Sequence, residues 1–330
     1  MSRPGLDANP LTLEAGWFNA LFDEIGIDAE VKGLTAKSIG TGQIGENVRF
    51  VFDYARKGAN APETLVGKFP SDSPESLMTA KMLGHYEREV NFYRTFPKVA
   101  GVITPKAFYT DYDAETNRFA LIMEDMAPSE QGDQLQGCSV AEAERALSAA
   151  AVMHAAHWND PALDTYAWLQ GSELAPPPAL APEAVQGLWH GFKERYGDRL
   201  EADDILVGDA YSAVLPAWSE SYEGPHALTH NDFRLDNMLF GADTAPKPLA
   251  VVDWQTAGKG APAGDVAYFI GAGLTREDRP QHELALLRFY HARLEEAGIR
   301  DYPFEALYDH YRWFSFYGMS VAFGAAMLVK

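Results

Sequence analysis

The stretch LTHNDFRLDNMLF occupies residues 228–240, and LAVVDWQ follows it at residues 249–255. The first stretch spaces a histidine, an aspartate and an asparagine as H-x-D-x-x-x-x-N among apolar residues. This pattern predicts an anchored loop whose polar side chains point into a cleft. The second stretch is apolar until it reaches Asp253, which predicts a buried strand that ends on a carboxylate.

The two stretches are expected to form a hairpin. Two prolines punctuate the segment between them, which predicts a turn between short strands at roughly 237–241 and 249–253. A hairpin of this kind would bring Asn237 and Asp253 side by side despite their separation in the sequence.

These side chains suit phosphoryl transfer from a nucleotide. Mg²⁺ prefers oxygen ligands and usually takes one or two protein carboxylate or amide oxygens beside phosphate and water. Asn237 and Asp253 can supply two such oxygens, and Asp232 is left to orient an attacking hydroxyl group. Each half of the pattern alone is also typical of a core histidine with a turn aspartate, or of a strand with a capping aspartate. Both halves in this order predict a kinase-like site.

A glycine-rich segment precedes this site in the first third of the chain. Residues 34–70 read as three strands, and Gly40, Gly42 and Gly45 are spaced G-x-G-x-x-G after the first. Glycines let a backbone approach phosphates and present N–H groups to them, although the same residues also suit a plain hairpin turn. A strand with alternating apolar residues follows them, which favours a flap over phosphates and not a dinucleotide-binding helix.

Lys68 lies near the end of the third of these strands and can contact phosphate oxygens. Residues 78–96 read as a helix whose inward face can hold this lysine through a carboxylate. Glu89 is the preferred partner and Glu87 the alternative, while ordinary surface charges remain a competing interpretation.

Residues 102–128 are expected to form a second hairpin with its turn near residues 113–117. The apolar run 119–123 leads into Glu124, Asp125 and Met126, which suits a connection between two lobes. The backbone of such a connection can read the edge of an adenine base.

The remainder of the chain is predicted to be mainly helical. In the helix at 139–158, Ser139 is a candidate cap, and His154 and His157 suit the core better than a metal site. Asp265 is a candidate cap or loop brace. Helical patterns, including one before the glycine segment, recur at residues 11–25, 183–222 (two), 264–271, 280–297 and 303–329.

Composition limits the classes of protein that fit. The 330 residues carry a formal net charge of −20, which disfavours nucleic-acid binding and is compatible with a cationic substrate. Hydrophobic residues make up 47% of the chain, enough for a sizeable core. The single Cys138, the lack of an apolar signal core in the first ten residues and the lack of a 20-residue apolar run favour a cytoplasmic protein without a membrane span.

In order along the chain, the motifs VGKFP, EREVNFY, IMEDM, HNDFRLDN, VVDWQ and GDVAYF resemble the protein-kinase-like phosphotransferases of small molecules. The resemblance covers nearly the whole chain. It extends to aminoglycoside and choline phosphotransferase relatives and most closely to the ecdysteroid-kinase-like and acyl-CoA-dehydrogenase-associated branches. It implies an α+β, bilobal, protein-kinase-like fold with ATP in the cleft. The expected small antiparallel-sheet N-lobe is residues 1–125, and the larger, mainly helical C-lobe is residues 126–330.

The resemblance also implies roles for individual residues. Lys68 would contact the nucleotide phosphates and pair with Glu89, below the flap formed by the three glycines. The segment Glu124–Met126 would supply the backbone that binds adenine. The catalytic base would be Asp232, and the Mg²⁺ ligands would be Asn237 and Asp253. Arg234 stands where many protein kinases place a lysine near the transferred phosphate, and would stabilise developing charge there.

The sequence departs from the family pattern in three places. Asn231 stands where the family usually has glycine, Trp254-Gln255 replaces the Phe-Gly of protein kinases, and the glycine segment ends in Gly-Glu-Asn. The expected activity is transfer of the γ-phosphate of ATP to a hydroxyl group of a small molecule, with Mg²⁺. The alternatives are a kinase-like protein that binds nucleotide or ligand without turnover, and a protein kinase.

Overall fold

The computed structural model describes residues 6, 9–40, 44–96, 103–175 and 181–328. The chain divides into two compact units. Unit 1 consists of Met1–Lys98 and Thr104–Pro128, and unit 2 of Val99–Ile103 and Ser129–Lys330. The fold is an antiparallel-sheet N-terminal region followed by a mainly helical part, as the sequence predicted.

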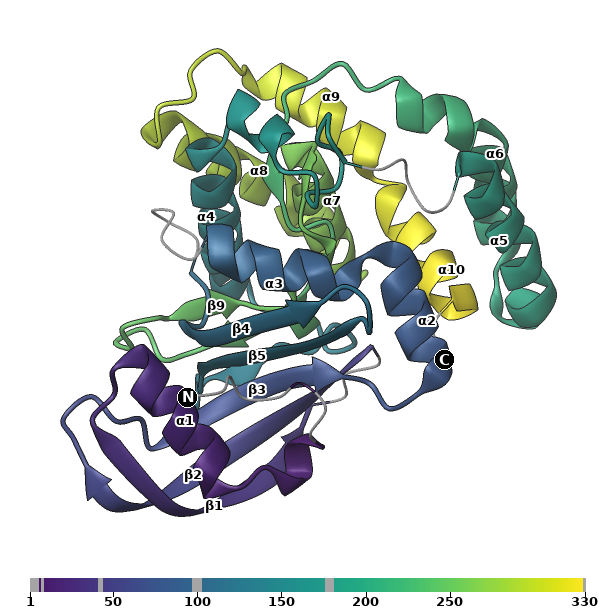
Figure 1. Cartoon of the computed structure of the whole chain (residues 1–330). Helices are drawn as coiled ribbons and strands as arrows, with labels where there is room; N and C mark the ends of the chain where they lie inside the picture. Colours follow the sequence, from purple (N-terminus) through teal and green to yellow (C-terminus); the bar gives the residue numbers. More distant parts are fainter. Residues whose placement is uncertain (1–5, 7–8, 41–43, 97–102, 176–180, 329–330) are drawn as a thin grey trace. The chain divides into compact units, whose positions relative to one another are not determined.

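The described strands of unit 1 form a five-stranded antiparallel sheet in the order β1-β2-β3-β5-β4 (Figure 1). The strands are β1 (Ala29–Ile39), β2 (Gly45–Lys57), β3 (Thr64–Pro70), β4 (Ala107–Asp113) and β5 (Arg118–Glu124). The two predicted hairpin regions are therefore confirmed, although β1 begins five residues before the expected start.

Buried apolar residues at alternate positions of β2 form the core of this sheet. Val48, Phe50 and Phe52 are buried, and aromatic residues of helix α1 (Ala15–Ile25) pack against them. Phe18 of α1 lies 4.8 Å from Phe50 and 4.9 Å from Phe52, measured between ring centroids. A 3-10 turn at Pro10–Thr12 precedes α1, so the helix expected at 11–25 begins later than predicted.

The helix predicted at residues 78–96 is two helices. Gly84 adopts φ 67° and separates α2 (Pro74–Leu83) from α3 (His85–Thr95). Only glycine takes this left-handed conformation without steric cost, which ends α2 and redirects the chain. Helix α3 contacts β4 and β5, and its buried residues include Tyr86 and Glu89.

Unit 2 is built mainly from helices (Figure 1). Ser139 caps the first of them in a capping box with Glu142, as the sequence suggested for Ser139. The helices are α4 (Val140–Ala156), α5 (Pro182–Tyr196), α6 (Ala202–Glu220), α7 (Pro262–Gly273), α8 (Arg279–Glu296), α9 (Phe304–Phe314) and α10 (Tyr317–Leu328), with 3-10 turns at Pro161–Thr165, Gly197–Arg199, Leu235–Asn237 and Trp254–Thr256.

The pattern at residues 303–329 is a further correction, because α9 ends at Phe314 and α10 begins at Tyr317. Phe323 is buried within α10. Trp189 of α5 and Tyr211 of α6 pack with Phe323 in a local core. Among the described residues, no helix is both long and apolar enough to cross a membrane.

Short strands complete the part of unit 2 that carries the predicted site. Strand β8 (Met238–Phe240) pairs antiparallel with β9 (Leu249–Val251) and with β6 (Glu130–Gln131). Strand β7 (Ala227–Thr229) pairs antiparallel with β10 (Gly258–Gly260). The hairpin predicted between residues 237 and 253 is thus confirmed, with shorter strands than expected.

Candidate active site

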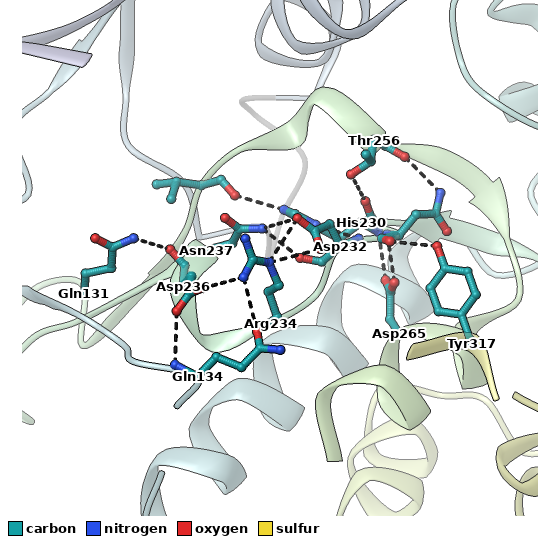
Figure 2. A network of polar contacts seen from close by, with 12 residues as sticks. Gln131, Gln134, His230, Asp232, Arg234, Asp236, Asn237, Thr256, Asp265 and Tyr317 are labelled. Atoms are coloured by element: carbon teal, nitrogen blue, oxygen red, sulfur yellow. Dashed lines mark hydrogen bonds and ion pairs between the residues drawn. The ribbon is translucent and has the colours of Figure 1, made fainter. Parts of the chain in front are cut away.

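The loop between β7 and β8 brings together the residues that the H-x-D-x-x-x-x-N spacing predicted (Figure 2). The side-chain amide of Asn237 donates to the backbone carbonyl of Asp232 at 2.9 Å and to its carboxylate at 2.8 Å. The carbonyl of Asn237 accepts the N–H of Val252 at 2.9 Å. Val252 directly precedes Asp253. The β8–β9 hairpin therefore holds the backbone of Asn237 against the residue before Asp253.

The orientation of the Asn237 amide is suited to a metal ligand. Its Nδ2 donates both hydrogen bonds to Asp232, which fixes the amide. The amide oxygen Oδ1 therefore points away from Asp232. Among the residues that the structure describes, none donates a hydrogen bond to Oδ1. An amide oxygen and the Asp253 carboxylate are the donor types that Mg²⁺ takes.

The backbone at Asp253 is left-handed, with φ 66° and ψ 59°. This conformation ends the path of strand β9 and starts the 3-10 turn Trp254–Thr256. Aspartate is among the few non-glycine residues that visit this region readily. The buried Trp254 indole donates to the carbonyl of Val251 at 3.1 Å and anchors the turn.

Asn231 is also left-handed, with φ 61°. Its side chain donates to the carbonyl of Thr256 at 2.9 Å and accepts the hydroxyl of Thr229 at 3.0 Å. A Cβ at Gly258 would lie 2.6 Å from the Asn231 amide nitrogen, so the opposite strand needs glycine there. The departure from the usual family glycine is explained, because asparagine tolerates this backbone and adds two hydrogen bonds.

Asp265 of α7 braces the loop from below, which selects one of the two roles left open by the sequence. Its carboxylate accepts the backbone N–H groups of His230 at 2.7 Å and Asn231 at 2.8 Å. It also contacts Nε2 of His154 at 3.3 Å, and Nδ1 of that histidine lies 2.8 Å from the hydroxyl of Tyr290. His154 and Tyr290 are fully buried, so His154 belongs to the core, as predicted.

His230 connects the loop to the strand that leads to Asp253. Its Nε2 lies 2.9 Å from the carbonyl of Val252, and its Nδ1 accepts the backbone N–H of Asp232 at 3.3 Å. These two contacts assign the proton to Nε2, since a carbonyl cannot donate. The imidazole is therefore a structural link between the two halves of the motif.

Arg234 lies between two carboxylates, which the sequence analysis did not anticipate (Figure 2). Its Nε lies 3.2 and 3.3 Å from the two carboxylate oxygens of Asp232, and its Nη1 pairs with Asp236. Burial opposes the charge on this guanidinium, but Asp232, Tyr268 and Asp236 raise the pKa of Arg234 above its usual value. The arginine therefore stays charged and contacts the predicted base directly.

Asp236, Gln131 and Gln134 complete this network and were missed from the sequence. The backbone N–H of Gln134 donates to the Asp236 carboxylate at 3.0 Å, and the Gln131 side-chain amide donates to the Asp236 carbonyl. The only signal available was an acidic residue directly before Asn237, and that residue carries no spacing rule of its own.

In unit 1, Lys68 pairs with Glu89 and not with the alternative Glu87. Its ammonium lies 2.7 and 2.9 Å from the two carboxylate oxygens of Glu89. The Lys68 side chain is 8% exposed and that of Glu89 is 1% exposed, so this is a buried ion pair. The predicted pairing is confirmed, while contact with nucleotide phosphates stays a prediction.

The glycine segment is described in part. Gly40 is left-handed with φ 71°, and Gly42 lies outside the described residues. A Cβ at Gly45 would lie 3.0 Å from the carbonyl of Phe69 and 3.3 Å from Cε of Lys68. Glycine at this position therefore lets β2 begin directly against the lysine.

The segment Glu124–Met126 follows β5 in unit 1. The Glu124 carboxylate accepts the backbone N–H of Lys106 at 3.0 Å. The Asp125 carboxylate forms two contacts with Arg49, at 2.7 and 2.9 Å. Among the described residues, none forms a hydrogen bond with the backbone of Met126. Its N–H and C=O are therefore available for the predicted contact with adenine.

Comparison with known proteins identifies the family of this chain. The model of the phosphotransferase enzyme family (APH) matches residues 52–308, a span that includes Lys68, the loop between β7 and β8, and Asp253. The chain belongs to this family. A search by sequence among curated proteins finds no significant match.

Solved structures show the same fold at low sequence identity. An ethanolamine kinase from Plasmodium vivax is 11% identical, with a TM-score of 0.56 over 93% of this chain and 80% of that one. The complex of APH(2")-IIia with GDP and kanamycin is 15% identical, with a TM-score of 0.52 over 92% and 89%. Spectinomycin phosphotransferase APH(9)-Ia, bound to ADP and spectinomycin, is 12% identical, with a TM-score of 0.51 over 96% and 89%.

Proposed function

We propose that this protein transfers the γ-phosphate of ATP to a hydroxyl group of a small molecule and requires Mg²⁺. The proposal depends on two contacts of Asn237. Its side chain donates to the Asp232 carboxylate, and its backbone carbonyl accepts the N–H of Val252, the residue before Asp253. Membership of the phosphotransferase enzyme family supports the reaction type.

Asp232 would act as the catalytic base. Its carboxylate orients the acceptor hydroxyl and takes its proton as the oxygen attacks the γ-phosphorus. A new O–P bond forms, the bond from the γ-phosphorus to the bridging oxygen breaks, and ADP leaves with the electron pair of that bond. Asn237 holds the Asp232 carboxylate at 2.8 Å, which fixes its direction before substrate arrives.

Asn237 and Asp253 are the residues that would hold Mg²⁺. The fixed amide of Asn237, with its oxygen unengaged by described residues, fits this role. The metal would supply charge neutralisation on the phosphate oxygens. Lys68, held by Glu89, is proposed to contact nucleotide phosphates as a point charge. The backbone of Glu124–Met126 is proposed to contact the adenine.

The acceptor class is proposed from charge and from the relatives. The net charge of −20 favours cationic ligands. The similar structures include an ethanolamine kinase and complexes with kanamycin and spectinomycin. Amino alcohols and amino sugars are therefore the first acceptors to test, beside neutral hydroxylated steroids.

An ATP-consumption assay with this panel tests the proposal, with and without Mg²⁺. We expect acceptor-dependent ADP release by the wild-type protein and loss of turnover in Asp232→Asn, with ATP binding retained. Asp243→Asn is the matched control, because Asp243 is 85% exposed and pairs with Arg145 at the surface. Tight ATP binding without turnover on any acceptor would support the alternative of a binding protein, and wild-type activity in Asp232→Asn would refute the base assignment.

A further inference from the structure

Asp236 is the charged residue of the catalytic loop to which the proposed function gives no role. Its carboxylate pairs with Nη1 of Arg234 and accepts the N–H of Gln134 at 3.0 Å. Its side chain is 36% exposed, and that of Arg234 is 31% exposed. The ion pair is therefore partly shielded from water, and Asp236 is in direct contact with the arginine that touches the proposed base.

The guanidinium of Arg234 is held on two edges. Its Nε contacts both oxygens of Asp232, and its Nη1 contacts Asp236 and the side-chain oxygen of Gln134, the latter at 3.3 Å (Figure 2). A guanidinium is planar and its N–H groups point in fixed directions, so contacts on two edges define the plane. The third nitrogen, Nη2, makes no hydrogen bond with any residue that the structure describes.

Two carboxylates are needed for this arrangement. With Asp232 alone, the Nε and Nη2 edge of the guanidinium matches a carboxylate and would form a two-bond pair with it. That pair would place a separate guanidinium nitrogen on each oxygen of Asp232, including the oxygen that must receive the acceptor hydroxyl. Asp236 draws Nη1 to the other side, so Arg234 contacts the two oxygens of Asp232 through the single Nε, at 3.2 and 3.3 Å.

We propose that Asp236 is a positioning residue that orients Arg234, keeping Nη2 available for an oxygen of the transferred phosphoryl group and Asp232 available for the acceptor. This inference rests on the proposed phosphotransfer. It also accounts for the contacts of Gln131, in β6, and of Gln134, in the segment after β6, which hold the backbone and the carboxylate of Asp236.

A double-mutant cycle between Asp236→Asn and Arg234→Met tests the proposal. The asparagine keeps an oxygen for the Gln134 N–H and leaves the backbone carbonyl for Gln131, so it removes charge without removing these hydrogen-bond acceptors. We expect kcat to fall roughly 10- to 100-fold in Asp236→Asn, the scale of a misplaced catalytic group. KM for ATP should change by about twofold or less, because the contacts that bind ATP equally in the ground state and the transition state are unaffected.

The double variant is the decisive measurement. If Asp236 acts through Arg234, the double variant has the kcat of Arg234→Met alone, because the arginine to be oriented is absent. Losses that multiply would overturn the proposal, as would unchanged kcat in Asp236→Asn or a loss confined to KM. The exposed Asp243→Asn serves as control and should match wild type.

Failure of the underlying function has a different signature. If wild-type protein neither hydrolyses ATP nor transfers phosphate to any acceptor of the panel, the proposed function and this inference fail together. If wild type turns over and the cycle is multiplicative, only the positioning role fails.

Discussion

Removal of the Glu89 carboxylate is expected to destabilise unit 1 strongly. Glu89 contacts Lys68 through both carboxylate oxygens, and both side chains are buried. In Glu89→Ala the ammonium of Lys68 stays in this buried place and loses the carboxylate. Breaking a buried pair by removing one partner costs about 3–5 kcal/mol. For a unit of this size that cost lowers Tm by roughly 10–20 °C.

Differential scanning calorimetry measures this shift. Glu87→Ala is the matched control, since Glu87 is an exposed glutamate on the same helix. Its effect should stay within about 0.5 kcal/mol. Equal shifts in the two variants would refute the reasoning, because burial of the pair would then contribute nothing measurable.

A double variant, Lys68→Met with Glu89→Leu, separates stability from function. Replacing a buried ion pair by apolar side chains of similar volume is often neutral or stabilising. We expect Tm close to wild type, together with loss of the phosphate contact proposed for Lys68, measured as weaker ATP binding by calorimetric titration. Retained ATP affinity would argue that the pair is structural only.

Three further substitutions probe unit 2. Asp253→Ala should weaken ATP binding in the presence of Mg²⁺ and leave binding without Mg²⁺ nearly unchanged; equal losses in both titrations would contradict the metal role. Asp265→Ala leaves the N–H groups of His230 and Asn231 without their acceptor, so unfolding in urea should show a loss of about 2–5 kcal/mol together with lower kcat. Asn231→Ala and Asn231→Gly both lose the side-chain hydrogen bonds of Asn231, but only alanine keeps a β-carbon at φ 61°. The alanine variant should therefore be less stable than the glycine variant by about 1–2 kcal/mol; equal stability of the two would refute the strain argument.

The sequence predicted the elements that carry a strong periodic pattern. Alternation placed Val48, Phe50 and Phe52 on one face of β2, and all three are buried. It could not predict the break at Gly84, because residues 78–96 contain no proline and this glycine is the only glycine within them. The break is decided by a left-handed backbone angle, and a single glycine within a helical pattern is compatible with either outcome.

Some residues of the candidate site could be predicted from their spacing in the sequence, and others could not. The spacing predicted that Asp232, Asn237 and the residues before Asp253 would be brought together, and the structure joins them through hydrogen bonds. Asp236 and Gln134 were not predictable, because their contacts join segments about 100 residues apart through a single side-chain network. Such contacts leave no periodic trace in the sequence.

Two residues with left-handed backbone angles give the loop and the turn of the candidate site their conformation. Asn231 and Asp253 precede the two parts of the site, the loop that carries Asp232 and the turn after β9, and both have φ above 60°. Each lies two residues after the end of a short buried strand, β7 or β9, and turns the chain there. The hydrogen bonds of Asp265 and His230 then stabilise these turns from buried positions. The site therefore depends on the packing of α7 as much as on its own polar residues, and substitutions beneath it should lower kcat without touching substrate.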